Sequence, residues 1–147
     1  LPIISGNIKV LGVWAYNHRA VKFGDNFSGY TSDAVKHYSS WLSLDEKIII
    51  SGDFNNSLIW DKGKNNDFKN LNQSFEGFDF KSSYHEYFNE GLGNESRGTL
   101  FHTKNRKKPY HIDYCYYKNF DLHRTQIENF DYWIKYSDHL PLIVDLK

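Results

Sequence analysis

The sequence has no methionine, a single cysteine and only three prolines among its 147 residues. Because one cysteine cannot form a disulfide within the chain, a reducing compartment such as the cytoplasm is the simplest expectation. The chain also opens on Leu1 and Pro2 without a leader segment. We therefore expect a cytoplasmic protein of which this chain is a piece.

An excess of one charge and long apolar runs are absent as well. The 18 basic residues equal the 18 acidic ones, so any attraction to nucleic acid must be local. No stretch predicts a signal peptide or a membrane span. Aromatic residues are abundant at 18%, which favours a sheet-rich packed domain. The length predicts one domain over residues 1–147.

A short apolar run at residues 48–50 is the centre of the sequence, because Asp53 and Asn55 follow it closely. The run predicts a buried strand of an α/β sheet, and ligands of such sheets usually lie beyond the carboxyl ends of strands. Residues two apart in an extended chain point the same way, so both polar side chains should face one cavity while Phe54 anchors the loop. The alternative is an ordinary turn, since Asp and Asn often cap their own backbone.

The segments before and after this run also predict regular elements. Residues 7–15 alternate as a strand with both faces covered, and N-cap chemistry at residues 31–33 opens a helix that continues through Leu42. The unit from residue 8 to residue 51 is therefore expected to be a crossover connection. Farther on, Phe68, Leu71 and Phe75 suit a modest surface helix.

The last third of the chain predicts a hairpin and two further strands. Residues 98–102 and 110–117 form the hairpin, and the two later strands cover residues 122–127 and 142–146. Asp113 lies in the aromatic second arm and needs a partner there, as either a site residue or a satisfied structural acid.

The loop between the two arms carries four cations within residues 104–108. A solvated hairpin tip is the default interpretation of this cluster. Beside a phosphate site, the same cluster could contact the backbone of a polyanion.

Four short motifs follow one another in a fixed order: Val13-Trp14-Ala15-Tyr16-Asn17, Ser51-Gly52-Asp53-Phe54-Asn55, His111-Ile112-Asp113-Tyr114 and Ser137-Asp138-His139-Leu140-Pro141. Together they resemble the motifs of the endonuclease/exonuclease/phosphatase family, although Tyr16 stands where the family usually has proline. The resemblance spans nearly the whole chain but only the C-terminal half of the family's domain. The family's opening strand, with its Asn, and its strand-end Glu, the principal metal ligand, have no counterpart here.

The resemblance implies an α/β (α+β) fold, a two-sheet β-sandwich flanked by helices, of which this chain supplies mainly the second half. Half of such a sandwich would expose an apolar sheet face. We therefore expect self-association or a retained N-terminal partner.

The resemblance also implies roles for individual residues. Asp53 would orient and deprotonate the attacking water, and Asn55 would hold that water or a phosphoryl oxygen. Asp138 would help to hold Mg²⁺, or Mn²⁺ in its place. His139 would contact the scissile phosphate while Asp113 fixes its tautomer and charge. The remaining candidates would bind substrate: Asn17, Trp14, Thr99, His102 and His111.

Three functions are consistent with these observations. The first is a Mg²⁺-dependent phosphodiesterase that acts on nucleic acid, because hydrolysis of phosphate esters needs a cation, a positioned water and donors to oxygen. The second is a phosphatase or phospholipase of the same fold that acts on a small or lipid phosphate. The third is a catalytically incomplete half-domain that lacks the upstream Glu.

Overall fold

The structure is a computed structural model that describes residues 2–15, 21–23, 26–28, 30–62 and 67–147. Its largest element is a five-stranded sheet in the order β1-β2-β5-β9-β6. These strands are β1 (Pro2–Ser5), β2 (Ile8–Trp14), β5 (Lys47–Asp53), β9 (Asp113–Lys118) and β6 (Lys81–Ser82).

Further elements surround this sheet. The helices are α1 (Tyr30–His37), α2 (Ser39–Leu42), α3 (Asp67–Gly77), α4 (Ser83–Phe88) and α5 (Phe130–Trp133), with short 3-10 turns at Leu58–Trp60 and His102–Lys104. Antiparallel pairs join β3 (Val21–Phe23) to β4 (Asn26–Ser28), β7 (Leu100–Phe101) to β8 (Pro109–Tyr110) and β10 (Leu122–Ile127) to β11 (Leu142–Leu146).

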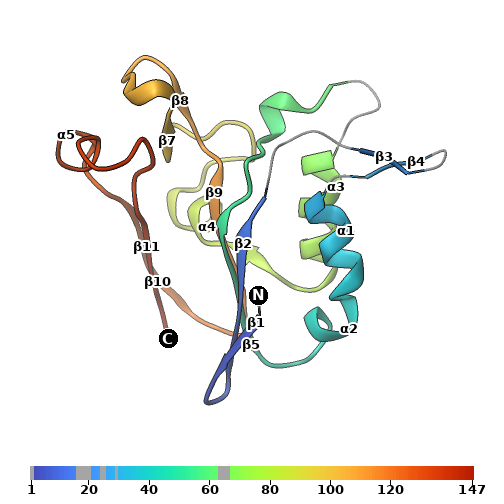
Figure 1. Ribbon diagram of the computed structural model, residues 1–147. Coiled ribbons are helices and arrows are strands. Elements are labelled where there is room, and N and C mark those ends of the chain that lie inside the picture. The colour runs from blue at the N-terminus through green and yellow to red at the C-terminus, as the bar shows by residue number, and fades with distance from the viewer. Residues whose placement is uncertain (1, 16–20, 24–25, 29, 63–66) are drawn as a thin grey trace.

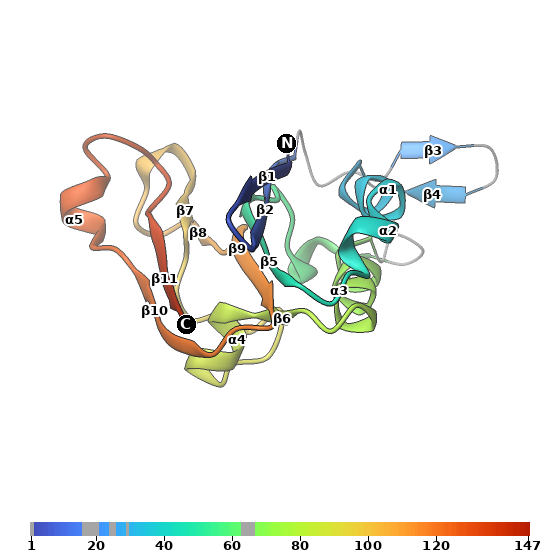
Figure 2. The same ribbon diagram turned by 90° about the horizontal axis from the view of Figure 1, so that it is seen from below.

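The molecule has three layers. Figures 1 and 2 show α1, α2 and α3 on one face of the five-stranded sheet and the β10–β11 pair on the other. Helix α4 lies beside β9 and β10 at one end of the gap between the two sheets. This mixed arrangement, with a sheet on either side of a gap and helices outside, confirms the predicted fold class. No described helix has the length and apolar character needed to cross a bilayer.

Strand β5 has hydrogen-bonded neighbours on both edges. It pairs in parallel with β2 and antiparallel with β9, so the predicted crossover from residue 8 to residue 51 is confirmed. Two backbone bonds continue the pairing past the strand end: the Ala15 amide donates to the Asp53 carbonyl at 2.8 Å, and the Phe54 amide donates to the Ile112 carbonyl at 3.0 Å. The end of β5 is thereby fixed against both neighbours.

The main core lies between the five-stranded sheet and the helices. Ile48 and Ile50 of β5 are buried there against α3, and Phe54 packs edge-on against Phe75 and Tyr114. Phe54 therefore anchors the loop after β5, as the sequence predicts. Burying an aromatic ring of this size contributes about 2 to 3 kcal/mol to stability.

Helix α3 confirms the predicted surface helix, because its apolar stripe is buried while most of its other residues are exposed. Two other local expectations were wrong. The helix predicted from residue 31 is interrupted at Tyr38, which separates α1 from α2. The second arm of the predicted hairpin is divided, since β8 pairs with β7 while β9 joins the large sheet. In each case, contacts with distant parts of the chain set where the helix or strand ends, and the local sequence pattern does not.

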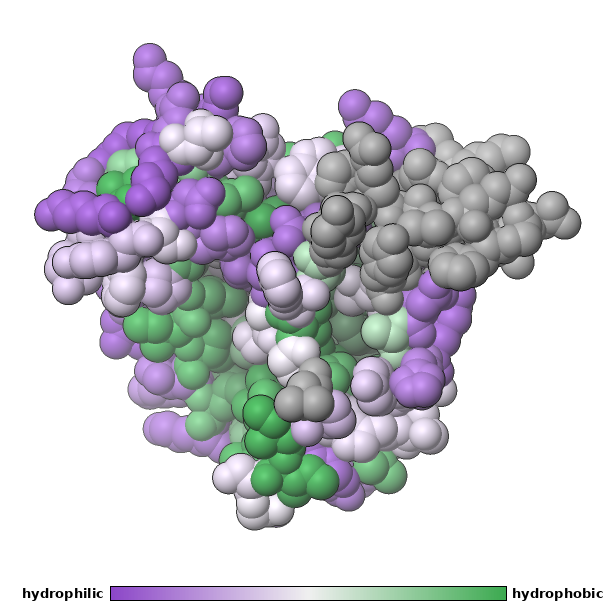
Figure 3. Space-filling view, viewed as in Figure 1, coloured by the Kyte–Doolittle hydropathy of each residue, from purple (hydrophilic) through white to green (hydrophobic). Residues whose placement is uncertain are grey.

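The expectation that both faces of β2 are covered was also wrong. Leu11 is buried on the helix side, whereas Gly12 and Trp14 on the opposite side are exposed. Ile3 and Ile4 of the edge strand β1 are exposed as well. Figure 3 shows apolar residues gathered on the face between β2 and the β10–β11 pair. This is the open apolar sheet face that we expected of half a sandwich.

The open face predicts self-association. We expect sedimentation velocity to show a mass above the 17.4 kDa of one chain as concentration rises, because an apolar edge strand is a template for pairing. Ile4→Lys should restore the monomer, since a charge on β1 opposes pairing with a second copy. A monomer at every concentration would contradict this expectation.

Candidate active site

Asp53 and Asn55 form a compact turn at the end of β5. Asn55 adopts a left-handed conformation with a φ of 45°. Its amide donates to one carboxylate oxygen of Asp53 at 2.7 Å, and its side-chain nitrogen donates to the other at 2.9 Å. The same nitrogen donates to the Ala15 carbonyl at 2.9 Å. The two side chains therefore converge through a turn, and the expectation of an extended chain here was wrong.

Gly52 lets β5 approach β2 closely just before this turn. Its φ is +145°, and a Cβ added there would lie 1.9 Å from the carbonyl oxygen of Val13. Any side chain at this position would push the two strands apart and move Asp53. The glycine is thus required by the geometry that fixes the carboxylate.

The electrostatic surroundings of Asp53 favour its protonated form. Burial raises the pKa of the Asp53 carboxyl above its usual 3.8, and the nearby Asp113 carboxylate raises it further. The bond from the Asn55 amide and the charge of His139 act in the opposite direction. A carboxylate with a raised pKa accepts a proton more readily, as a general base requires.

Asp113 and His139 form the pair that the resemblance implies. The Nδ1 atom of His139 lies 3.0 Å from one carboxylate oxygen of Asp113 and 3.2 Å from the other. Asp113 is also the residue opposite Asp53 in the antiparallel pairing of β5 with β9, so the two carboxylates lie on the same face of the sheet. The structure therefore brings Asp53, Asp113 and His139 together.

The hydrogen bond with Asp113 sets the state of the imidazole. It raises the pKa of His139 above its usual 6.5, against the effect of burial, and the charges of Asp113, Asp53 and Asp138 act in the same direction as the bond. Donation from Nδ1 to the carboxylate leaves Nε2 as the nitrogen that can face a ligand. When protonated, Nε2 is a charged donor suited to an anionic oxygen.

Thr99 ties the Asp113 strand to the loop that carries His139. Its hydroxyl oxygen accepts from the amides of Ile112 and Asp113, each at 3.1 Å. Its carbonyl oxygen accepts from the Leu140 amide at 2.7 Å. The side chain is fully buried, so the expected contact with substrate is not supported. Thr99 is instead a positioning residue for the Asp113–His139 pair.

Asp138 lies in the same loop and is half-buried. Its carbonyl oxygen accepts from the Phe101 amide at 2.7 Å, and the hydroxyl of Ser137 accepts from the His139 amide at 3.0 Å. These bonds fix the backbone of the loop. Neither bond involves the carboxylate of Asp138, whose position is set by its own side-chain torsions. Asp138 is thus beside His139, where the resemblance implies a metal ligand.

A cavity of about 340 Å³ lies beside the Asp113–His139 pair. Its lining combines the pair with residues of β5, β9, α5, the turn after α5 and the start of β11: Ser51, Gly52, Asp113, Tyr114, Trp133, Ser137, His139, Leu140, Pro141 and Leu142. A phosphate group and an attached sugar are small enough for such a space. Sequence reasoning missed Trp133 as part of this wall, because it belongs to none of the four motifs.

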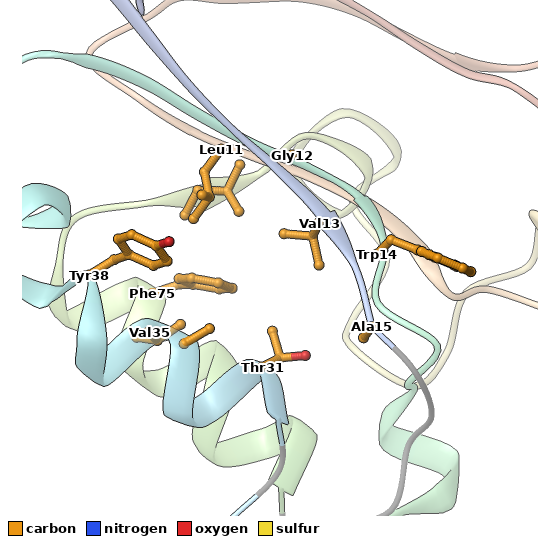
Figure 4. A pocket seen from close by; sticks show the side chains of 11 residues that line it. Leu11, Gly12, Val13, Trp14, Ala15, Thr31, Val35, Tyr38 and Phe75 are labelled. Carbon is orange, nitrogen blue, oxygen red and sulfur yellow. The ribbon is translucent and has the colours of Figure 1, made fainter. Parts of the chain in front are cut away.

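A second cavity, of about 350 Å³, lies between β2 and α1 (Figure 4). Its walls are almost wholly apolar and include Leu11, Val35 and Phe75. In Figure 4 the ring of Trp14 points away from the other labelled side chains. Its lining has no charged side chain for phosphate chemistry, so we place the candidate site at the first cavity.

The other substrate-binding candidates differ in position. Trp14 is the partner of Asp53 in the parallel pairing of β2 with β5, so it lies beside the site, with its side chain 86% exposed. His102 is exposed in the turn after β7. His111 is buried against Tyr84, with its Nδ1 atom 2.9 Å from the Arg97 carbonyl oxygen, and burial lowers its pKa. Asn17 lies outside the described residues.

The donors at this site fit a hard cation only in part. Mg²⁺ usually takes one or two protein carboxylates and keeps several waters, and Asp53 and Asp138 are donors of that kind. Within the described ranges, however, no group of three or more His, Cys, Asp or Glu side chains is arranged to hold a metal ion. A metal centre would need further ligands from a substrate, from water or from residues beyond those described.

The role of Thr99 can be tested through the pKa of His139. We expect Thr99→Val to lower that pKa toward 6.5 in an NMR titration, because loss of the hydroxyl frees the backbone that holds Asp113. Thr99→Ser should restore the wild-type value. Asp113→Asn should lower the pKa at least as far.

A matched control is Thr125→Val. Thr125 is a buried threonine of β10 whose hydroxyl donates to the carbonyl oxygen of Ser83 in α4. Each valine variant should lose about 1 to 3 kcal/mol of stability, but only the change at position 99 should move the His139 titration. Equal titration curves for both variants would show that Thr99 contributes to stability alone.

Comparison with known proteins places this geometry in a known fold. No family model matches the sequence, and no curated protein matches it. The structure of the 3′ phosphatase NExo from Neisseria, bound to a product DNA hairpin, matches with a TM-score of 0.65 and 14% identity, over 99% of this chain and 63% of that one. An endonuclease/exonuclease/phosphatase family protein from Leptotrichia buccalis matches with a TM-score of 0.60 and 12% identity, over 95% of this chain and 48% of that one.

The chain thus spans less than two thirds of the length of either structure. At these identities the match concerns the fold and not the activity. Over nearly its whole length, this chain has the fold of endonuclease/exonuclease/phosphatase proteins.

Proposed function

We propose that this chain carries the phosphate-binding part of a phosphoesterase site and acts on nucleic acid. The observation that carries the proposal is the Asp113–His139 pair, set beside the raised-pKa carboxylate of Asp53 at the end of a buried strand. A carboxylate base and a charged imidazole donor on one sheet face are what hydrolysis of a phosphate ester needs from protein side chains. The fold shared with a DNA-bound 3′ phosphatase supports the same chemistry.

In this proposal, ionised Asp53 accepts a proton from the water that attacks phosphorus. The bond from phosphorus to the leaving ester oxygen breaks, and that oxygen takes a proton from solvent. The Asn55 amide groups hold the Asp53 carboxylate in one orientation. Protonated His139 donates from Nε2 to a phosphate oxygen, which stabilises the charge that develops in the transition state. Asp113 keeps His139 charged and oriented.

A divalent cation, Mg²⁺ or Mn²⁺, would complete the proposed site. Asp138 would be one of its ligands, and the cation would neutralise charge on the phosphate oxygens. No described group of side chains forms a complete metal centre, and this observation favours the alternative of an incomplete half-domain. A missing N-terminal half, or a second copy of the chain, would then supply the remaining ligands.

The basic cluster at residues 104–108 supports nucleic acid as the substrate over a small or lipid phosphate. It lies on the 3-10 turn and loop between β7 and β8, with Lys107 and Lys108 exposed. Arg106 stacks on the ring of Phe130, 4.3 Å from its centre, and pairs with Asp131. A long polyanion can contact such a cluster while one of its phosphates occupies the site, which a small substrate cannot do.

Asp53 and the cation should both be required for turnover. We expect the wild-type chain to cleave single-stranded or plasmid DNA with Mg²⁺, and EDTA to abolish this cleavage. With Mg²⁺ present, Asp53→Asn should lower the rate of cleavage roughly a hundredfold to ten-thousandfold, because the general base is lost. Gel and fluorescence assays of the product give both values.

Asp61→Asn is the matched control for this substitution. The Asp61 carboxylate accepts from the amides of Phe68 and Lys69 at the start of α3, away from the site. This variant should keep wild-type turnover. Full turnover by Asp53→Asn in EDTA would refute the proposed chemistry. If the wild-type chain shows no turnover alone but regains it when the missing half is added, the incomplete half-domain is supported.

The dependence of kcat/KM on pH should be bell-shaped. Asp53 acts when ionised, so kcat/KM should rise as pH rises through its pKa, which lies above 3.8. His139 acts when protonated, so kcat/KM should fall as pH rises through its pKa, which lies above 6.5. Asp113→Asn should move the alkaline limb to lower pH. An alkaline limb that stays in place would contradict the role given to the pair.

A further inference from the structure

Three aromatic side chains form a connected group beside the site. Tyr132 is 56% exposed and Tyr136 is 69% exposed. Their ring centres lie 5.8 Å apart, and Trp133 lies 5.4 Å from Tyr132 and 6.2 Å from Tyr136. Trp133 also lines the cavity that holds Asp113 and His139. The group therefore leads from solvent to the wall of the site.

Both cations and acids lie near this aromatic group. The acids are Asp131, which pairs with Arg106, and Glu128, which accepts a hydrogen bond from the Trp133 indole. Lys135 lies between Trp133 and Tyr136 in the sequence, and the Lys104 ammonium group donates to the Lys135 carbonyl at 3.3 Å. Arg106 stacks on Phe130 in the first turn of α5. Aromatic rings interleaved with basic side chains are the combination that binds bases and backbone of single-stranded nucleic acid.

We propose that α5 and the turn after it, through Tyr132 and Tyr136, form a stacking platform for unpaired bases of a single strand whose phosphate lies at His139. This inference rests on the proposed function and narrows its substrate class to single-stranded nucleic acid or to the frayed end of a duplex. The cations of residues 104–108 and Lys135 would hold the strand's phosphates.

The geometry of the rings favours unpaired bases. Their planes are inclined to one another by 56° to 82°, so they cannot enter a continuous stack of parallel base pairs. Each exposed ring can instead take one base that has turned out of such a stack. A duplex shields its base faces, so only its backbone would reach the cations.

The same geometry disfavours a lipid surface as the partner. Helices that lie in a membrane interface carry a broad apolar face over several turns. Helix α5 has only four residues, and the two exposed rings of the platform, Tyr132 and Tyr136, carry phenol hydroxyl groups. The platform is too short and too polar to bury deeply among acyl chains.

Binding without turnover tests this inference. Fluorescence anisotropy in EDTA would compare a short labelled single strand with its duplex, using wild type, Tyr132→Ala/Tyr136→Ala and Tyr132→Phe/Tyr136→Phe. We expect the alanine pair to weaken single-strand binding roughly tenfold or more and to leave duplex binding nearly unchanged, since stacking contributes strongly for each base. The phenylalanine pair should bind as wild type does, because it keeps both rings.

Two controls separate stacking from other effects. Tyr87→Ala removes a tyrosine that is 45% exposed on α4, and it should not change binding. Lys107→Ala/Lys108→Ala should weaken single-strand and duplex binding alike and flatten the salt dependence, because these side chains contact phosphates.

Several results would overturn the platform: no measurable binding of the single strand by wild type, equal losses for single strand and duplex in the alanine pair, or no loss in either. Tyrosine-dependent sedimentation with vesicles of phosphatidylserine and phosphatidylcholine would replace it with a lipid-binding surface. Since the assay requires no hydrolysis, a chain that binds as expected but never cleaves, even when the missing half is added, would refute the proposed function and keep the platform. Cleavage that does not depend on either tyrosine would refute the platform and keep the proposed function.

Discussion

The structure depends on strand β5 being held along both edges and anchored at its end. Parallel pairing with β2 and antiparallel pairing with β9 set its register, and Phe54 fixes the end of the strand in the core. A slip of one residue would turn Asp53 from the site face to the helix face and expose Ile48 and Ile50. The chemistry of the site thus follows from the burial of a short apolar strand.

The same constraint explains how residues distant in the sequence meet. Asp113 lies opposite Asp53 because β9 pairs with β5, and His139 joins them because Thr99 binds the backbone on both sides. Most of these links are backbone hydrogen bonds, which do not depend on the charge of any side chain. The titrating groups can therefore change protonation state while the framework stays in place.

Much of this fold can be predicted from the sequence, because its strongest signals are local. The apolar run before Asp53, the crossover and the anchoring role of Phe54 need only periodicity and burial. The break at Tyr38 and the division of the strand at Ile112 depend on contacts with distant elements, which no local pattern contains.

The site shows the same division. The motifs predicted which polar residues converge at the sheet end, and Asp53, Asp113, Asp138 and His139 lie there. The motifs did not predict that Thr99 and His111 are buried. A threonine or histidine in a hairpin is equally consistent with a residue that contacts substrate and with a buried structural residue. Trp133 and the tyrosines beside it lie outside every motif, and only the fold brings Trp133 to the wall of the cavity.

The most direct test of the account is a crystal structure of the protein with a nucleoside 3′-phosphate and Mn²⁺. We expect the phosphate to lie within hydrogen-bonding distance of Nε2 of His139, in the cavity beside Asp113, with the cation bound by Asp138 and a phosphate oxygen. A well-ordered phosphate bound elsewhere, with His139 still paired to Asp113 and facing only water, would contradict the claim that this pair is built to bind a phosphate ester.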